Sequence, residues 1–334
     1  GRLTLKGGVR EILATEMLEA LGVNTSRTFS LIETGEQLMR GDEPSPTRSA
    51  VLVRLSHSHI RIGTFQRLAA LGDAETMQQL VDYCLTILYD AAPDDNPAVQ
   101  LLNLVVERTA DLAASYMVAG FVHGVLNSDN INITGESFDY GPWRFTEYWD
   151  PRFTAAYFDE GGLYAFGRQA EAIHWDVGQL AVSLRLLSEA PPLIEALELF
   201  PALYQAAIVR RFLWRLGVHS QSEEKDRALV KAAERAMVHE QIPVDVFFHD
   251  HRGGRVADAD GYGEMRATFG QLVGEYANPA GTRHEYWAAA RPCSILIDEV
   301  ETIWSAIAGN DDWNPLYRKI EAIRQMGDAH RDPA

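Results

Sequence analysis

The sequence predicts an α+β fold in which a small N-terminal lobe of strands and one helix precedes a large, mostly helical lobe. Two patterns predict it. Alternating, β-branched runs are concentrated before residue 66, and apolar side chains recur at helical spacing over most of the remaining chain. The length of 334 residues is enough for two such lobes around a sizeable core. We therefore expect residues 1–66 to form a partial N-lobe and residues 67–334 to form the helical C-lobe.

The N-terminal lobe is expected to hold one helix and two strands. Apolar side chains in residues 9–21 repeat at spacings of three, four and seven, and Gly22 follows as a residue that ends helices. Residues 28–33 (TFSLIE) and 50–56 (AVLVRLS) have the β-branched, alternating pattern of strands, with a polar, proline-containing loop between them. These strands should pair as a hairpin or lie as neighbours.

The C-terminal lobe is expected to be helical except for residues 121–172, which are rich in glycine, aspartate and aromatic side chains. The helices predicted from apolar periodicity and turn signals cover residues 75–90, 98–119, 175–187, 193–200, 202–216, 223–237, 265–276, 295–308 and 315–326. An irregular stretch held by rigid helices is where catalytic and binding residues usually lie.

Composition excludes several classes of function. The net charge of −17 repels phosphate, so neither a nucleic acid nor an anionic membrane surface is expected as a partner. Because no apolar run approaches about 18 residues, we expect no membrane-spanning helix. The two cysteines, Cys84 and Cys293, allow neither a disulfide framework nor a paired-cysteine zinc site. A reducing, cytoplasmic location fits this composition.

The motif that carries chemistry lies in residues 121–141. Asn130 follows His123 by seven residues, the spacing of the kinase catalytic loop H-R-D-x-x-x-x-N, and Asp139-Tyr140-Gly141 resembles the D-F-G turn nine residues later. A short strand is expected at residues 131–133. Phosphoryl and nucleotidyl transfer require a divalent metal on phosphate oxygens, and Mg²⁺ prefers oxygen ligands such as this amide and carboxylate. The motif predicts a protein-kinase-like fold with a metal site.

One position departs from kinase chemistry. The kinase base would stand at position 125, which is a valine here and cannot accept a proton. Asp129, next to the predicted metal ligand, is the nearest carboxylate that could act as the base. The alternative is that Asp129, Asn130 and Asp139 are ordinary turn residues, since Asn and Asp are common in turns.

The sequence around this motif resembles the selenoprotein O family of pseudokinase-fold protein adenylyltransferases. The likeness rests on HGVLNSDNINITGESFDYGPWRFTEYWDP, on GRLTLKGGVREILATEMLEALGVNTSRTFSLIETGE, on VRLSHSHIRIGTFQR and on the stretch from Tyr164 to Trp175. It is dense from residue 1 to about 190 and weak after residues 212–218. It implies transfer of AMP from ATP to Ser, Thr or Tyr hydroxyls of proteins, with Mg²⁺ or Mn²⁺ and with the nucleotide reversed relative to a kinase.

The resemblance also implies a role for each matching position. It implies that Asn130 and Asp139 are metal ligands and that Asp129 abstracts the proton. It also implies that Glu11 takes the place of the glutamate near the nucleotide and that Arg54 and Arg61 bind the terminal phosphates. Gly1 would lie in a turn that approaches the nucleotide. Arginine is suited to the role implied for Arg54 and Arg61, because guanidinium groups donate bidentately to phosphate. The alternatives are surface salt bridges for the arginines and an ordinary acid in a first helical turn for Glu11.

Two departures from the family pattern set further expectations. The lysine that pairs with Glu11 in that family lies upstream of Gly1, so we expect this chain to be a fragment or to lack its upstream part. Asp176 stands where the family usually has an asparagine.

Several weaker patterns are interpreted structurally. The His249-Asp250-His251 cluster follows a strand-like VDVFF segment and is interpreted as surface loop residues rather than a metal site. The aromatic residues from Tyr140 to Trp149 are interpreted as packing against the helical lobe. Two other functions stay open beside adenylylation: a kinase-like phosphotransferase that uses Asp129 as its base, and a catalytically silent scaffold.

Overall fold

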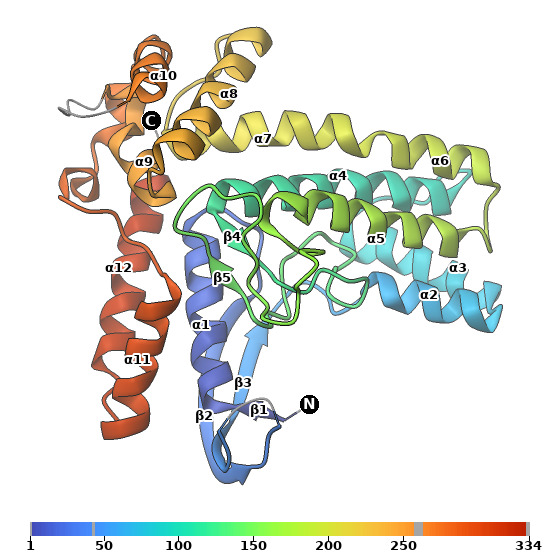
Figure 1. Cartoon of the computed structure of the whole chain (residues 1–334). Helices are drawn as coiled ribbons and strands as arrows, with labels where there is room; N and C mark the ends of the chain where they lie inside the picture. The colour runs from blue at the N-terminus through green and yellow to red at the C-terminus, as the bar shows by residue number, and fades with distance from the viewer. Residues whose placement is uncertain (1, 42–43, 257–262, 332–334) are drawn as a thin grey trace.

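The computed structural model describes residues 2–41, 44–256 and 263–331, and its N-terminal part is a twisted hairpin beside one helix (Figure 1). Three antiparallel strands run in the order β1-β3-β2. They are β1 (Leu3–Thr4), β2 (Arg27–Leu38) and β3 (Thr47–Leu55). The predicted pairing of two strands is therefore confirmed, although β2 extends five residues beyond the predicted end.

The helix predicted over residues 9–21 is present as α1 (Leu5–Ala20), and it packs against β2 and β3. Thr4 begins the helix, because its side-chain oxygen accepts the Gly7 backbone N–H. Gly8 permits a close approach to the sheet: a Cβ there would lie 2.3 Å from a methyl carbon of Leu31. The helix ends before Gly22, which has a φ of 73°.

The remaining helices form the helical part of the molecule, in which α4 lies between α5 and α7 (Figure 1). They are α2 (Ile62–Leu71), α3 (Ala74–Tyr83), α4 (Pro97–Ala119), α5 (Gln169–Leu184), α6 (Ala190–Glu198), α7 (Phe200–Leu216), α8 (Glu223–Glu240), α9 (Val244–Asp250), α10 (Glu264–Gly274), α11 (Ile297–Asn310) and α12 (Asn314–Arg331). Helix α4 is buried along most of its length and contacts α5, α6 and α7. It ends before Gly120, whose φ of 71° gives the left-handed conformation that stops a helix.

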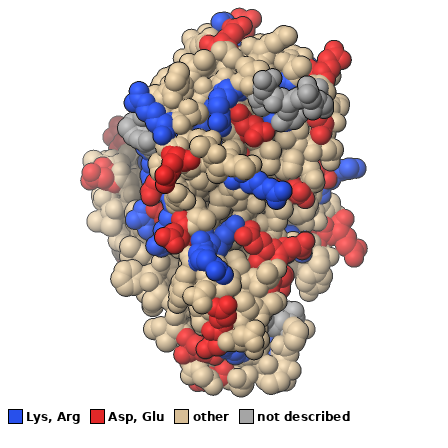
Figure 2. Space-filling view, turned by 90° about the vertical axis from the view of Figure 1, so that its left-hand side faces the viewer, with Lys and Arg blue, Asp and Glu red and all other residues tan. Residues whose placement is uncertain are grey.

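The last two helices return to the N-terminal lobe and lie along α1 (Figure 1). Gly327 of α12 faces Ala20 so closely that a Cβ there would lie 3.1 Å from the alanine Cα. Ion pairs join the same helices, from Arg324 to Glu16 at 2.8 Å and from Lys6 to Glu301 at 2.7 Å. On the face of the molecule shown in Figure 2, basic and acidic side chains are interspersed.

The irregular region between α4 and α5 is also confirmed. It contains the two-residue strands β4 (Phe121–Val122) and β5 (Arg144–Phe145), which pair with each other. The predicted strand at residues 131–133 is wrong: only an isolated bridge joins Asn132 to Arg61. Around this bridge, the Ile131 carbonyl oxygen accepts the Ile62 N–H and the Ile133 N–H donates to the Ile60 carbonyl oxygen, and a turn follows at Gly135.

Two helices differ from the sequence prediction. The segment VDVFF is not strand-like but forms α9, because Val244, Phe247 and Phe248 are buried together at helical spacing. His249 and His251 are buried, so their interpretation as surface residues is also wrong. Helix α2 was not predicted.

One stretch differs from the expectation that no segment is apolar and long enough to span a membrane. Among the described residues, Ala190–Leu216 is long and apolar enough to cross a membrane by length and composition alone. One such segment is weak evidence for a span. In the structure it is divided into α6 and α7, and both helices pack on α4.

Candidate active site

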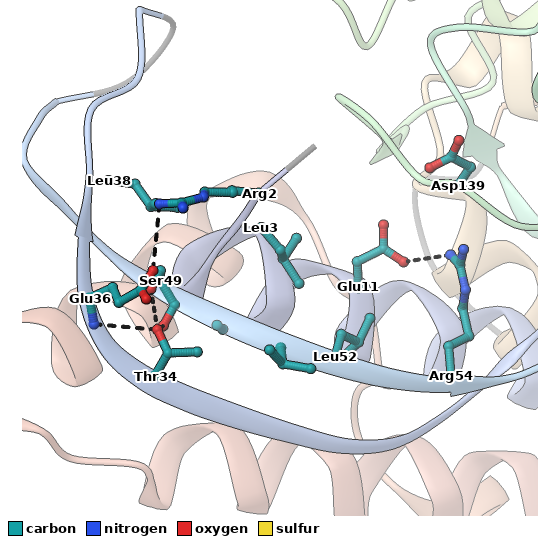
Figure 3. A pocket seen from close by; sticks show the side chains of 12 residues that line it. Arg2, Leu3, Glu11, Thr34, Glu36, Leu38, Ser49, Leu52, Arg54 and Asp139 are labelled. Carbon is teal, nitrogen blue, oxygen red and sulfur yellow. Dashed lines mark hydrogen bonds and ion pairs between the residues drawn. The ribbon is translucent and has the colours of Figure 1, made fainter.

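A pocket of about 500 Å³ lies between α1, the hairpin and the loop that follows β4 (Figure 3). Three of the predicted site residues line it, each from a different element: Glu11 from α1, Arg54 from β3, and Asp139 from the loop. The other residues that line it are Arg2, Leu3, Thr34, Glu36, Leu38, Ser49, Ala50, Val51 and Leu52. The structure therefore brings together residues that are 128 positions apart in sequence.

The pair of Glu11 and Arg54 is the electrostatic centre of this pocket. Arg54 Nη1 lies 3.4 Å from Glu11 Oε2, and the glutamate side chain is only 11 % exposed. The pKa of Glu11 is raised to about 7: burial raises it most, Arg54 lowers it, and the nearby carboxylate of Asp139 raises it further.

His123 holds the predicted catalytic loop against the segment that carries Asp139. Its ring is fully buried; Nδ1 accepts the Val125 backbone N–H, and Nε2 lies 3.2 Å from the carbonyl oxygen of Phe138. Burial lowers the pKa of His123, which favours the neutral ring that this hydrogen-bond pattern requires. The side chain of Gln169 accepts the His123 backbone N–H and donates to Phe121. His123 is therefore a structural link between the two halves of the loop.

The two predicted metal ligands lie in this loop. Asn130 donates through Nδ2 to the carbonyl oxygen of Val125 at 2.9 Å, which engages its nitrogen and not its amide oxygen, the atom that Mg²⁺ prefers. Asp139 has a φ of 60°, a conformation uncommon outside glycine and found at functional sites. No cluster of three or more His, Cys, Asp or Glu suited to a metal occurs in the described part of the chain. This donor set fits a metal that takes its other ligands from phosphate oxygens.

The predicted base, Asp129, is exposed at the tip of the loop beside the first turn of α2. A Cβ on Gly63 would lie only 2.1 Å from Asp129 Oδ1, so the glycine provides the space for this carboxylate. Arg61 Nη1 donates to the backbone carbonyl oxygen of Asp129 at 3.1 Å and lies 4.0 Å from Asp139 Oδ2. Arg61 therefore connects the predicted base to a predicted metal ligand.

The two predicted phosphate-binding arginines occupy neighbouring positions. Both guanidinium groups lie over the ring of Phe138, at 5.7 Å for Arg54 and 6.0 Å for Arg61. Only Arg54 lines the pocket, whereas Arg61 stands beside it. Gly1, the remaining predicted residue, lies outside the described residues.

Two supporting contacts were not predicted from the sequence. The carboxylate of Glu136 is 1 % exposed and accepts the backbone N–H of His57 at 3.0 Å, and it also contacts the ring of His57 at 3.1 Å. Arg10 lies over the ring of Trp143 and donates to its carbonyl oxygen at 2.9 Å. The first contact fastens the end of β3 to the loop, and the second fastens α1. In the sequence, the only indication of these contacts is that Glu136 and Arg10 lie near apolar or aromatic residues.

The aromatic residues of this region pack as predicted. Trp143, Phe145 and Trp149 are buried, and the ring centroids of Phe121 and Phe145 are 5.2 Å apart. Their contacts belong to the hydrophobic core of the helical lobe. These buried aromatic residues give the loop a rigid support.

Comparison with known proteins places the chain in a family. Residues 1–324 match the sequence model described as protein adenylyltransferase SelO. A protein nucleotidyltransferase YdiU of Gloeobacter violaceus is 40 % identical over 97 % of this chain and 71 % of its own length. The protein of the same name from Synechocystis sp. is 39 % identical over 97 % of this chain and 73 % of its own, and that from Synechococcus elongatus is 38 % identical over 99 % and 73 %.

Proposed function

Because this chain belongs to the family of the protein adenylyltransferase SelO, we propose that its pocket binds ATP with a divalent metal and directs AMP to a protein hydroxyl group. Membership makes the protein a nucleotidyltransferase with ATP and proteins as its substrates. The observation that carries the assignment of the site is the meeting of Glu11, Arg54 and Asp139 in one pocket, next to a loop with valine at position 125.

In the proposed reaction the acceptor oxygen attacks the α-phosphorus of ATP. A bond forms between that oxygen and phosphorus, the bond from the α-phosphorus to the bridging oxygen breaks, and pyrophosphate leaves. Asp129 accepts the proton of the acceptor hydroxyl; its exposure at the loop tip makes it reachable by a macromolecule. The acceptor is a Ser, Thr or Tyr side chain.

Asn130 and Asp139 would hold Mg²⁺ or Mn²⁺, which would neutralise phosphate charge when bound. Arg54 and Arg61 would bind the β- and γ-phosphates and stabilise the charge that develops on the leaving pyrophosphate. Glu11 orients Arg54 through their contact at 3.4 Å. The arrangement of Arg61 between Asp129 and Asp139 supports a single site in which base, metal and phosphates are adjacent.

We also propose a protein-kinase-like arrangement, with a boundary between the lobes near residues 66 and 67. Supporting it are the hairpin and α1 on one side of the pocket and the loop with Asn130 and Asp139 on the other. A cytoplasmic location is part of the proposal, and the free thiols of Cys84 and Cys293 agree with it.

A phosphotransferase that uses Asp129 as its base is the second candidate, because an exposed carboxylate beside a metal loop could equally activate a hydroxyl for attack on a γ-phosphate. A catalytically silent scaffold is less supported, because α1, β3 and the loop place oppositely charged groups into one pocket.

The position of the label distinguishes these functions. The complete gene product is incubated with metal and either α-³²P-ATP or γ-³²P-ATP, and protein-bound label is measured. We expect label from the α-position only, and loss of transfer in Asp129→Asn with nucleotide affinity largely retained. Asp95→Asn, an exposed loop substitution, is the matched control. Label from the γ-position would establish the kinase alternative, and nucleotide binding without any transfer would establish the scaffold.

A further inference from the structure

A second pocket, of about 440 Å³, is lined in part by the two residues that precede the proposed base in the chain. It lies between the catalytic loop and the start of α5. Its lining residues are Leu126, Asn127, Ser128, Leu163, Tyr164, Arg168, Glu171, Ala172 and Trp175. Asn127 and Ser128 immediately precede Asp129 in the chain, so one wall of the pocket is the loop segment that carries the proposed base.

The surface of this pocket is apolar and partly exposed. Leu163 is 52 % exposed and Trp175 is 63 % exposed, although both are large hydrophobic side chains. Ala172 lies beneath them, 9 % exposed. At the rim, Arg168 and Glu171 form an ion pair at 3.1 Å, so their charges compensate. A ligand would therefore be selected here by apolar contact rather than by net charge.

The walls of the pocket are held in place by hydrogen bonds. The carboxylate of Asp159, 9 % exposed, accepts the backbone N–H groups of Leu163 at 2.7 Å and Tyr164 at 2.8 Å. On the opposite wall, the Ser128 hydroxyl donates to Gln66 and the Ser128 carbonyl oxygen accepts the Gly63 N–H at 3.0 Å. A pocket built in this way does not have to be ordered by its ligand, which favours binding.

We propose that this pocket receives an apolar side chain of the acceptor protein, within about three residues of the hydroxyl group that is modified. The inference rests on the proposed function, since it assumes a protein segment whose hydroxyl reaches Asp129. An extended segment advances about 3.3–3.6 Å per residue, so a neighbour of the modified residue can reach a hollow that begins at Ser128. Leucine, isoleucine, methionine and phenylalanine match its apolar lining.

The test uses peptides of defined sequence as acceptors. Thirteen-residue peptides carry a central Ser, Thr or Tyr, and each position within three residues of it is occupied in turn by Leu, Asp or Lys. Initial rates of label incorporation from α-³²P-ATP give kcat/KM for the complete gene product. We expect leucine at one position to raise kcat/KM roughly tenfold or more over Asp and Lys, the gain typical of burying one such side chain.

Two variants close the pocket in different ways. Ala172→Trp fills it from beneath, and Leu163→Glu places a charge on its exposed wall without disturbing the core. Both should remove the preference for leucine and leave the affinity for ATP, measured by calorimetry, unchanged. Val182→Glu is the matched control, because Val182 lies on α5 outside the pocket and is 65 % exposed. It should retain the preference.

A binding measurement separates this inference from the proposed function. Fluorescence anisotropy of labelled peptides, with Mg²⁺ and an ATP analogue that cannot be cleaved at the α-phosphate, should show tighter binding of the leucine peptide to wild type than to Leu163→Glu. Absence of transfer to every peptide together with this binding difference would count against the proposed chemistry only. Equal binding of all peptides to wild type, equal losses in Leu163→Glu and Val182→Glu, or pocket-dependent self-association instead of peptide binding would overturn the inference.

Discussion

Replacing Asp176 with asparagine should stabilise the protein at neutral pH. Asp176 lies on α5 with no exposed surface, and neither carboxylate oxygen has a hydrogen-bond partner among the residues that the structure describes. Burial raises its pKa from 3.8 to about 8. An unpartnered carboxylate in such a place is unfavourable when it is ionised.

The sign and the size of the effect follow from the two pKa values. The folded state holds the proton more tightly than the unfolded state, so this group favours folding fully below pH 3.8, and that stability is lost as the pH rises toward about 8. Between pH 3.8 and pH 7, a span of 3.2 pH units, the unfolded carboxyl is ionised while the folded one stays protonated. At 1.36 kcal/mol per unit, the free energy of unfolding falls by about 4 kcal/mol over this span. At pH 4.5 the same arithmetic gives about 1 kcal/mol.

The asparagine variant has the same shape and cannot ionise. Thermal and urea unfolding of wild type and Asp176→Asn from pH 4.5 to 8 should show a gain for the variant that grows with pH, reaching an increase in Tm of roughly 6 °C at pH 7. Asp95→Asn, in an exposed loop, should match wild type throughout. A gain that does not depend on pH, or a variant less stable than wild type at pH 7, would refute the assignment of a buried, protonated carboxyl.

Five further substitutions test the candidate site and its support. Asp139→Ala should abolish metal-dependent nucleotide binding, and unchanged calorimetric titrations with metal would contradict its role as a ligand. Arg54→Ala or Arg61→Ala should weaken ATP at least tenfold more than AMP, because only ATP carries the terminal phosphates; equal losses would argue against phosphate contact. Gly63→Ala should displace the proposed base, whose Oδ1 would lie 2.1 Å from the new Cβ, and should lower transfer while nucleotide affinity persists. Gly327→Leu should force α12 from α1 and lower the free energy of unfolding by about 1–3 kcal/mol, as measured in urea.

The parts of the fold that sequence predicted well are those determined by neighbours in the chain. Helix α4 combines a proline in its first turn, an apolar face and Gly120 after its last turn, and its boundaries agree within one residue of the prediction. Short apolar runs are ambiguous, because five residues fit either a strand or a turn and a half of helix. The residues Val244–Phe248 became helical because α9 packs Phe247 against Phe269 of α10, with ring centroids 4.8 Å apart.

The position of α11 and α12 could not be predicted by any local rule. Their apolar spacing predicted two helices but gave no information on the partner that covers them. The contacts that place them against α1 join residues about 300 positions apart, through Gly327 and through exposed ion pairs such as Arg324 with Glu16. Exposed pairs of this kind contribute about 0–1 kcal/mol each and leave no recognisable pattern in a single sequence.

The alternation of strand β3 carries information about the candidate site. Ala50, Leu52 and Arg54 occupy alternate positions of β3 and are more buried than Val51, Val53 and Leu55, which are exposed. An arginine at an inward position of an otherwise apolar strand is unfavourable unless a carboxylate and a polar space accompany it. Glu11 supplies the carboxylate at 3.4 Å and the pocket supplies the space. The alternation alone therefore predicts an inward Arg54 that requires an acidic partner, but only the fold identifies that partner, because α1 crosses the sheet at the turn that carries Glu11.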